Sequence, residues 1–227
     1  MTTKAHFLLL GDSHAGPIGL AAQDEGVAFS GGPLGAGREF TAHFFEPGDG
    51  DMVLRKPDAD QRYRQFLSEL AITRLADLPV PLVSTFGLSL HFYATRDNWP
   101  AYRLPDQQFA PGFLQSRLFD TIIAQMARDA LAFYRLARTM GLRVLAVLPP
   151  QRVPALSDAE VFMAAQHCLH SKLTALGVEI IDVRKRVCDS QGLQRPEYCE
   201  ADDPIHGNLA FGRQILAELM RRGVAVM

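Results

Sequence analysis

Cysteine is scarce in this chain, long apolar runs are missing, and neither sign of charge dominates. Three cysteines among 227 residues, Cys168, Cys188 and Cys199, form no Cys-x-x-Cys pair, so neither a disulfide framework nor a zinc site is indicated. No apolar run approaches the ~20 residues of a membrane span. The four apolar residues before Gly11 are too few for the core of a signal peptide. We therefore expect a cytoplasmic protein that makes no contact with a membrane.

The balance of charge excludes a further class of partner. The chain has 23 Lys and Arg against 25 Asp and Glu, a formal net charge of -2. Proteins that bind nucleic acids usually present a basic face to the phosphates, so we expect no nucleic-acid partner. Hydrophobic residues make up 48% of the chain, which is enough for a core of ordinary size without a disulfide or metal to hold it.

Short apolar runs alternate with longer amphipathic segments along the chain. The runs predict strands over residues 7–11, 27–31, 81–86, 142–148 and 178–183, and the amphipathic segments predict helices over residues 15–23, 59–75, 115–140, 158–176 and 209–222. Such alternation is typical of β-α-β units, whose parallel sheet is covered by helices on both faces. We predict one three-layer α/β/α domain over residues 1–227, with a mainly parallel five-stranded sheet. Irregular insertions are expected near residues 38–57 and 91–111, the first with a hairpin over residues 44–54.

The first candidate site is a serine between the first strand and the first helix. The apolar run ends in Gly11-Asp12-Ser13-His14. Ligands bind at the carboxyl ends of parallel strands, and a helix N-terminus offers free N–H groups to a developing oxyanion. Asp and Ser are also preferred helix N-caps, so this segment alone fits simple capping as well as catalysis. A catalytic serine needs a base elsewhere in the chain.

A suitable base stands near the other end, in Asp203-Pro204-Ile205-His206, just before the last predicted helix. A serine hydroxyl needs a base within hydrogen-bond reach, most often histidine, and that histidine needs a carboxylate to set its tautomer. In a turn-like loop, the spacing lets the carboxylate of Asp203 reach Nδ1 of His206 while Nε2 faces the serine. We therefore predict a catalytic triad of Ser13, His206 and Asp203.

These two segments resemble the first and last blocks of the SGNH (GDSL-like) hydrolase superfamily. The histidine after the serine is similar to the variant in domains associated with saccharide O-acylation and de-acylation, and residues 206–212 resemble the way those domains enter their final helix. The resemblance implies a flavodoxin-like fold and the triad above. It also implies an oxyanion hole made by the serine N–H, a glycine N–H from a second block and an asparagine side chain from a third. It implies no metal and no cofactor.

The second and third blocks match this pattern less closely. Residues 30–37 are rich in glycine, and we expect Gly32, or else Gly35, to supply the backbone donor. The third block should read Gly-x-Asn, but Gly87-Leu88-Ser89 has Ser89 in the place of the asparagine. Loss of one oxyanion donor typically costs ~10²–10³ in turnover. Either Ser89, His91 or Asn98 supplies the missing donor, or the protein is a slow enzyme, or it binds without cleaving.

Other histidines and the second insertion leave further alternatives open. His14 could contact the substrate or serve only at the start of the helix, and His91 could bind the substrate or the oxyanion. His167 and His170 lie on one predicted helix without a matching carboxylate, so we expect a solvated helix face there and no metal site. The aromatic residues within 92–102 could line an acyl or sugar pocket, or pack as a lid on the core.

Together these features predict a serine esterase that cleaves a small O-acyl ester. The resemblance suggests acetyl on a carbohydrate, so the expected partner is a small-molecule or saccharide ester. Two other functions stay open. One is a saccharide O-acyltransferase; the other is a non-catalytic SGNH-like binding protein, which the replacement of the asparagine by Ser89 would favour.

Overall fold

A parallel sheet of five strands forms the centre of the structure, a computed structural model that describes residues 5–224. Residues 1–4 and 225–227, which the predicted domain includes, lie outside the described range. The strands of this sheet are β1 (Leu8–Gly11), β2 (Ser30–Pro33), β5 (Leu82–Ser84), β6 (Val144–Val147) and β7 (Glu179–Ile181). Their spatial order is β2-β1-β5-β6-β7, which is the doubly wound order of flavodoxin-like folds.

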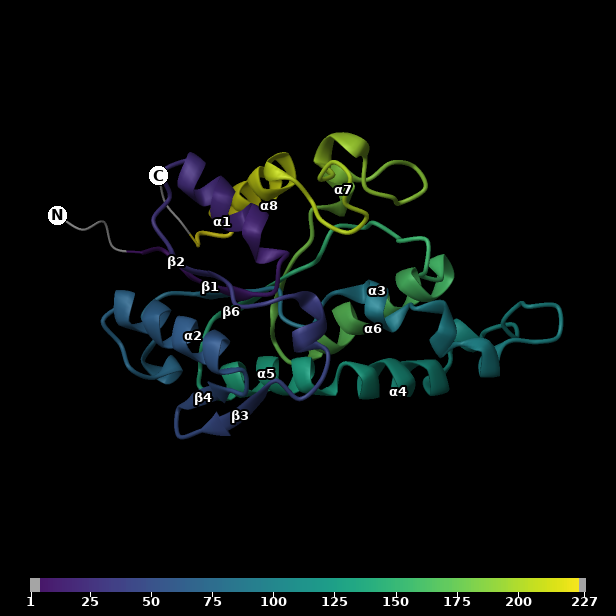
Figure 1. The fold of residues 1–227 in the computed structure, drawn as a ribbon, viewed down its shortest axis with the longest axis horizontal. Coiled ribbons are helices and arrows are strands. Elements are labelled where there is room, and N and C mark those ends of the chain that lie inside the picture. Colours follow the sequence, from purple (N-terminus) through teal and green to yellow (C-terminus); the bar gives the residue numbers. More distant parts are fainter. Residues whose placement is uncertain (1–4, 225–227) are drawn as a thin grey trace.

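Helices cover both faces of the sheet (Figure 1). One face carries α1 (Ala15–Asp24), α7 (Arg184–Val187) and α8 (Leu209–Arg221). The other carries α2 (Pro57–Glu69), α3 (Leu90–Tyr93), α4 (Arg117–Met126), α5 (Arg128–Thr139) and α6 (Ala159–Ala175). The predicted three-layer α/β/α fold is therefore confirmed. Within residues 5–224, none of the helices combines the length and the apolar character needed to cross a membrane.

Strand β1 shows why the strands read as continuous apolar runs. Successive side chains of a strand point to opposite faces. Accordingly, Leu8 and Leu10 pack with the layer of α2 and α5, while Leu9 packs with α1 and α8. Helices α1 and α8 approach so closely that a Cβ on Gly212 would lie 2.0 Å from the carbonyl oxygen of Pro17. Glycine is required at this contact because no side chain fits.

Three predicted elements differ from the structure, and the hairpin agrees with it. The helix predicted over residues 59–75 ends at Glu69, and the chain then turns at Ala71, which has a positive φ of 57°. Strand β2 begins at Ser30 and not at Val27, because the N–H of Val27 still donates to Ala22 at the end of α1. The single helix predicted over residues 115–140 is two helices, with non-helical dihedrals at Ala127 (φ -97°, ψ 8°) and no Gly or Pro to signal the break. Strands β3 (Phe45–Gly48) and β4 (Asp51–Leu54) form the predicted antiparallel hairpin.

The strand order places the candidate site. From β1 the chain goes first to β2 on one side and later to β5 on the other, so the order reverses between β1 and β5. In open parallel sheets, ligands bind beyond the carboxyl ends of the strands at this point of reversal. Ser13 directly follows β1, and residues 85–91 directly follow β5. The topology therefore brings these two segments to one crevice.

Candidate active site

Ser13, His206 and Asp203 form a continuous chain of hydrogen bonds. Ser13 Oγ lies 2.7 Å from His206 Nε2, although 193 residues separate them in the sequence. His206 Nδ1 lies 2.6 Å from Asp203 Oδ2. Because a carboxylate can only accept hydrogen bonds, the proton of the neutral imidazole belongs on Nδ1. Nε2 is then free to accept the proton of the serine hydroxyl.

The loop before α8 holds the carboxylate of Asp203 in its ionised form. Its Oδ1 accepts hydrogen bonds from the N–H groups of Ile205 (2.7 Å) and His206 (2.8 Å). Partial burial acts to raise the pKa of Asp203, but the hydrogen bonds from the His206 ring and from these two N–H groups bring the pKa down to about 2. The carboxylate is thus charged near neutral pH, where it can stabilise an imidazolium beside it.

Asn208 anchors the same loop to the start of α8. Its Oδ1 accepts the N–H of Phe211 at 3.2 Å, which caps the helix. Its Nδ2 donates to the carbonyl oxygens of Glu197 and Cys199, both at 3.0 Å. A side chain that caps a helix and ties down a loop fixes their relative position. Two members of the hydrogen-bonded chain are therefore held at a set distance from the helix that follows them.

A buried carboxylate, that of Asp12, holds the turn that carries Ser13. It accepts hydrogen bonds from the N–H of His14 (3.0 Å), the hydroxyl of Thr85 (3.0 Å) and the hydroxyl of Ser89 (2.7 Å). The side chains of Asp12, Thr85 and Ser89 are at most 1% exposed, and burial of a carboxylate requires such pairing. The network ties the end of β1 to the segment after β5. The sequence alone does not reveal this network because Gly-Asp-Ser also fits a helix cap, and only the partners across the sheet show the difference.

This network corrects one of the predictions for the missing oxyanion donor. Ser89 has a single hydroxyl proton, which it donates to Asp12; the expectation that it faces the substrate is therefore wrong. Asn98 is exposed, and its amide donates to the carbonyl oxygen of Phe92 at 3.2 Å. Of the three residues considered, His91 is the one whose side chain is not engaged elsewhere within residues 5–224.

The two glycines predicted as backbone donors lie in different surroundings. Gly32 lies inside β2, opposite Leu10 of β1. The N–H groups of Ser30 and Leu34, two residues to either side, donate to carbonyl oxygens of β1 and of the residue before it. Because alternate residues of a strand direct their N–H groups the same way, the N–H of Gly32 also faces β1, and Gly32 is wrong as a donor to the site. Gly35 lies past the end of the strand, and its N–H has no partner among the described residues.

Two further histidines, His14 and His91, border the triad residues. The rings of His14 and His206 lie 5.0 Å apart between centroids. Burial lowers the pKa of His14. Burial, and the repulsion that a proton on His91 would meet from protonated His14 and His206, lower the pKa of His91 to about 4. Both imidazoles are therefore neutral near pH 7. Nδ1 of His14 is buried without a partner in the described part of the chain, so the hydrogen bond at the helix start comes from the backbone of His14 and not through Nδ1 of its ring.

We expect the protein to lose stability as the pH falls from about 6.5 to about 4. In this range the unfolded histidines, with pKa near 6.5, bind protons that His14 and His91 do not bind in the folded state. Stability therefore rises with pH through this window. Melting temperatures measured from about pH 7.5 to about pH 4.5 test this, with the non-titrating variant His91→Gln as comparison. Its melting temperature should fall less than that of the wild type; parallel curves would contradict the assignment.

The aromatic residues of the second insertion pack inward. Trp99 is 1% exposed, and its Nε1 donates to the carbonyl oxygen of Tyr93 at 2.9 Å. Its ring lies against those of Phe113 and Phe119. This segment was expected either to line an acyl or sugar pocket or to pack as a lid on the core. Trp99 and Tyr93 pack on the core.

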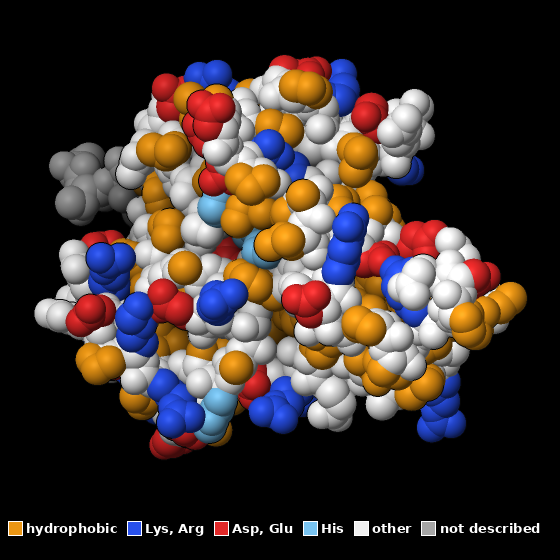
Figure 2. All heavy atoms as spheres, turned by 45° about the vertical axis from the view of Figure 1, so that its right-hand side comes forward, with side chains coloured by type: hydrophobic (Ala, Val, Ile, Leu, Met, Phe, Trp, Pro, Cys, Tyr) orange, Lys and Arg blue, Asp and Glu red, His pale blue; other side chains and the backbone are white. Residues whose placement is uncertain are grey.

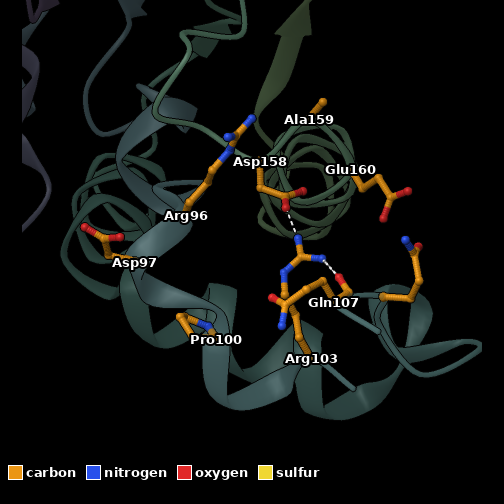
Figure 3. A pocket seen from close by; sticks show the side chains of 9 residues that line it. Arg96, Asp97, Pro100, Arg103, Gln107, Asp158, Ala159 and Glu160 are labelled. Atoms are coloured by element: carbon orange, nitrogen blue, oxygen red, sulfur yellow. Dashed lines mark hydrogen bonds and ion pairs between the residues drawn. The ribbon is translucent and has the colours of Figure 1, made fainter. Parts of the chain in front are cut away.

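The outer side of the same insertion forms one wall of an open polar pocket of about 520 Å³ against the start of α6. Figure 3 shows Arg103 reaching across it to Asp158, with which it forms an ion pair. Beside the pocket, the hydroxyls of Thr95 and Ser157 donate to the carbonyl oxygen of His91. The pocket therefore adjoins the candidate site without containing the triad residues. It is lined by Arg96, Asp97, Pro100, Arg103, Gln107, Gln108, Asp158, Ala159 and Glu160.

Metal-binding side chains do not gather anywhere in residues 5–224. No group of three or more His, Cys, Asp or Glu is arranged there to hold a metal ion. His167 is exposed on α6, and His170 is half-buried on the same helix.

No protein-family model matches the sequence, and no curated protein sequence matches it either. Solved structures do match the fold. A candidate acylhydrolase from Bacteroides fragilis aligns with a TM-score of 0.50 and 13% identity, over 98% of this chain and 87% of that one. A candidate platelet activating factor from Streptococcus pneumoniae gives 0.54 and 13%, over 97% and 85%. A candidate SGNH hydrolase from Slackia heliotrinireducens gives 0.51 and 15%, over 96% and 100%.

Identities this low establish the fold and nothing finer. The similarity to these solved structures agrees with the parallel sheet and its strand order. It also agrees with the resemblance of the first and last segments of the sequence to the SGNH superfamily. The chain has the SGNH hydrolase fold.

Proposed function

We propose that this protein is a serine ester hydrolase that forms an acyl-enzyme on Ser13. The observation that carries the proposal is the pair of short hydrogen bonds, 2.7 Å from Ser13 to His206 and 2.6 Å from His206 to Asp203. A hydroxyl held by a base, with the base held by a carboxylate, is the arrangement that activates serine as a nucleophile. Its place at the carboxyl edge of an SGNH hydrolase fold supports the same reaction.

The reaction proceeds in two halves. Ser13 Oγ attacks the ester carbonyl as its proton passes to Nε2 of His206, and Asp203 stabilises the resulting imidazolium. The tetrahedral intermediate then collapses, the alcohol leaves with the proton from His206, and the acyl group stays on Ser13. In the second half, water attacks the acyl group with His206 as base. The acid leaves, and the serine proton is restored.

We assign three donors to the oxyanion that forms in each half. The N–H groups of Ser13 and Gly35 have no partner among the described residues, and the first lies just before α1, where the helix dipole also favours negative charge. The third donor is the ring of His91. Its segment follows β5, as the asparagine block does in the family, and its neutral ring carries one N–H.

We expect His91→Ala to lower kcat for p-nitrophenyl acetate by about 10²-fold, the usual effect of losing one oxyanion donor. His91→Gln keeps an N–H donor and should retain more of the activity. His167→Ala, at an exposed site on α6, is the matched control and should behave as wild type. An equal loss for the alanine and glutamine variants, or a change confined to KM, would contradict the assignment.

A fluorophosphonate probe tests the proposed nucleophile directly. We expect the probe to attach to Ser13, as identified by mass spectrometry of the labelled peptide, and to leave Ser13→Ala unlabelled. Such probes react with a hydroxyl only when a neighbouring base activates it. If Ser13 stays unlabelled and the wild type hydrolyses esters no faster than Ser13→Ala, the non-catalytic binding protein becomes the better description.

We propose a small acyl group such as acetyl, carried by a carbohydrate hydroxyl, as the ester that is cleaved. The histidine after the serine supports this choice, because it resembles the saccharide O-acyl variant of the family. An acyl-enzyme can equally pass its acyl group to another hydroxyl. Product analysis with and without acceptor saccharides separates the two reactions: a new ester indicates an acyltransferase, and release of the free acid alone indicates a hydrolase.

A further inference from the structure

Beside the triad lies an arginine that has no acidic partner. Arg152 follows β6 at the carboxyl edge of the sheet, and its Nη1 donates to the carbonyl oxygens of His206 (2.6 Å) and Glu200 (3.2 Å). Glu200 contributes its main chain and not its carboxylate. Within residues 5–224, Arg152 forms no ion pair, and its Nη2 and Nε make no hydrogen bond. The side chain is nevertheless half-buried.

Most half-buried arginines among the described residues form ion pairs; besides Arg152 the exception is Arg138, whose Nη1 donates to the carbonyl oxygen of Leu142. Arg103 is paired with Asp158, Arg184 with Asp182. Nε and Nη2 of Arg152 are not among the buried polar atoms without a partner, so both stay accessible to solvent and to a ligand. Guanidinium also presents parallel N–H groups that match a carboxylate or a phosphate. The free Nη2 and Nε of Arg152 form one such edge.

A second arginine, Arg38, lies near His91 and forms no ion pair with any residue of 5–224. The guanidinium of Arg38 lies 5.8 Å from the ring centroid of Phe92, and that ring lies 4.0 Å from the ring of His91. Figure 2 shows histidine side chains in the middle of this face, with Lys or Arg side chains nearby. The carboxylate of Asp12, by contrast, is enclosed and fully hydrogen-bonded. Arg38 and Arg152 are thus two guanidinium groups near the candidate site that form no ion pair within residues 5–224.

We propose that the ester substrate carries an anionic group, a carboxylate or a phosphate, and that Arg152 binds it. The inference rests on the proposed hydrolysis at Ser13. Nη1 stays on the main chain of His206, while Nη2 and Nε hold the anion. Because His206 returns its proton to the leaving alcohol, and Arg152 contacts His206, we assign the anionic group to the alcohol part of the substrate. Arg38, more exposed and therefore more screened, adds a weaker attraction.

A pair of esters that differ in one charge tests the proposal. 4-Acetoxybenzoate is anionic, and 4-acetoxybenzamide is neutral and of similar size; each kcat/KM is divided by the uncatalysed rate. We expect the wild type to prefer the anionic ester by about tenfold or more, equivalent to about 1.4 kcal/mol. Arg152→Gln should bring this ratio close to one. Arg152→Lys keeps the charge but loses the paired N–H groups, so its ratio should be intermediate.

The ratio separates recognition of charge from damage to the loop. Arg62→Gln, at an exposed arginine of α2 without an ion pair among the described residues, is the matched control and should keep the wild-type ratio. A wild-type ratio near one overturns the proposal. So does an equal loss on both esters in Arg152→Gln, which would leave Arg152 only its structural bonds to the loop.

Two further substrates locate and define the anion. p-Nitrophenyl hemisuccinate carries its carboxylate on the acyl part of the ester. If the wild type prefers it over p-nitrophenyl acetate but does not prefer 4-acetoxybenzoate over 4-acetoxybenzamide, the assignment of the anion to the alcohol part is overturned. 4-Acetoxyphenyl phosphate replaces 4-acetoxybenzoate in a second comparison with the neutral ester. The anion that gives the larger ratio of kcat/KM values is the group that the site prefers. If Ser13→Ala hydrolyses every ester as fast as the wild type, the proposed function fails and this inference fails with it. Ser13-dependent hydrolysis without a charge preference removes the anion site alone.

Discussion

Replacing Ser13 with alanine is expected to lower kcat for p-nitrophenyl acetate by about 10⁴-fold or more. The variant loses the attacking oxygen itself, so no acyl-enzyme can form. What remains is the rate at which water attacks a substrate that the oxyanion donors and the binding contacts still hold. The Asp12 network does not include the Ser13 side chain, so the melting temperature should stay near that of the wild type.

Steady-state rates and melting curves of the two proteins provide the measurement. Ser68→Ala, at an exposed serine of α2, is the matched control and should keep full activity. An activity of Ser13→Ala within a few fold of the wild type, in a folded protein, would show that Ser13 is not the nucleophile. The short hydrogen bond to His206 would then have a structural meaning only.

Replacing Asp203 with asparagine is expected to lower kcat by about 10⁴-fold while leaving the loop in place. The side-chain oxygen of asparagine can still accept the N–H groups of Ile205 and His206 that Oδ1 of Asp203 now accepts. Its amide nitrogen, however, cannot accept the proton on Nδ1 of His206. The imidazole then favours the other tautomer, whose Nε2–H points at Ser13 and cannot take its proton.

The neighbouring residue offers a close control for this variant. Asp202 is exposed and has a positive φ of 56°, a conformation that asparagine tolerates, so Asp202→Asn should retain activity. Because the pKa of Asp203 is about 2, protonation of Asp203 should not limit the wild-type rate above about pH 4. If Asp203→Asn and Asp202→Asn lose activity equally, the loss follows from the change in net charge. Asp203 would then have no specific role in orienting the imidazole of His206.

The hydrogen-bonded arrangement of Ser13, His206 and Asp203 could be expected from the sequence because each residue type stands in a recognisable local motif. Gly-Asp-Ser after an apolar run, and Asp-x-x-His before a final helix, each define a side chain and its place relative to one element. The order of strands then brings the two ends together. The oxyanion donors could not be predicted in the same way, since a backbone N–H has no residue type of its own. Whether Gly32 or Gly35 is free depends on the register of β2 against β1.

Ser89 shows the same limit for a side chain. From the sequence it stands where the family has an asparagine, and a hydroxyl there could reach either a substrate or a neighbour. The structure places it 2.7 Å from the carboxylate of Asp12, 77 residues earlier in the chain. Arg152 went unnoticed for a related reason, because its contacts are with main-chain oxygens of a loop that follows some 50 residues later.

The sequence by itself determined the alternation of strands and helices and the three side chains at Ser13, Asp203 and His206. Periodicity and short motifs are local, and burial on both faces of a parallel sheet leaves a pattern that can be read directly. Only the tertiary structure decided which groups around Ser13 are free. A hydrogen-bond donor is available to a substrate only when no acceptor of the protein already binds it. Which acceptors lie near is set by the register of β2 against β1, by the buried carboxylate of Asp12 and by loops far along the chain.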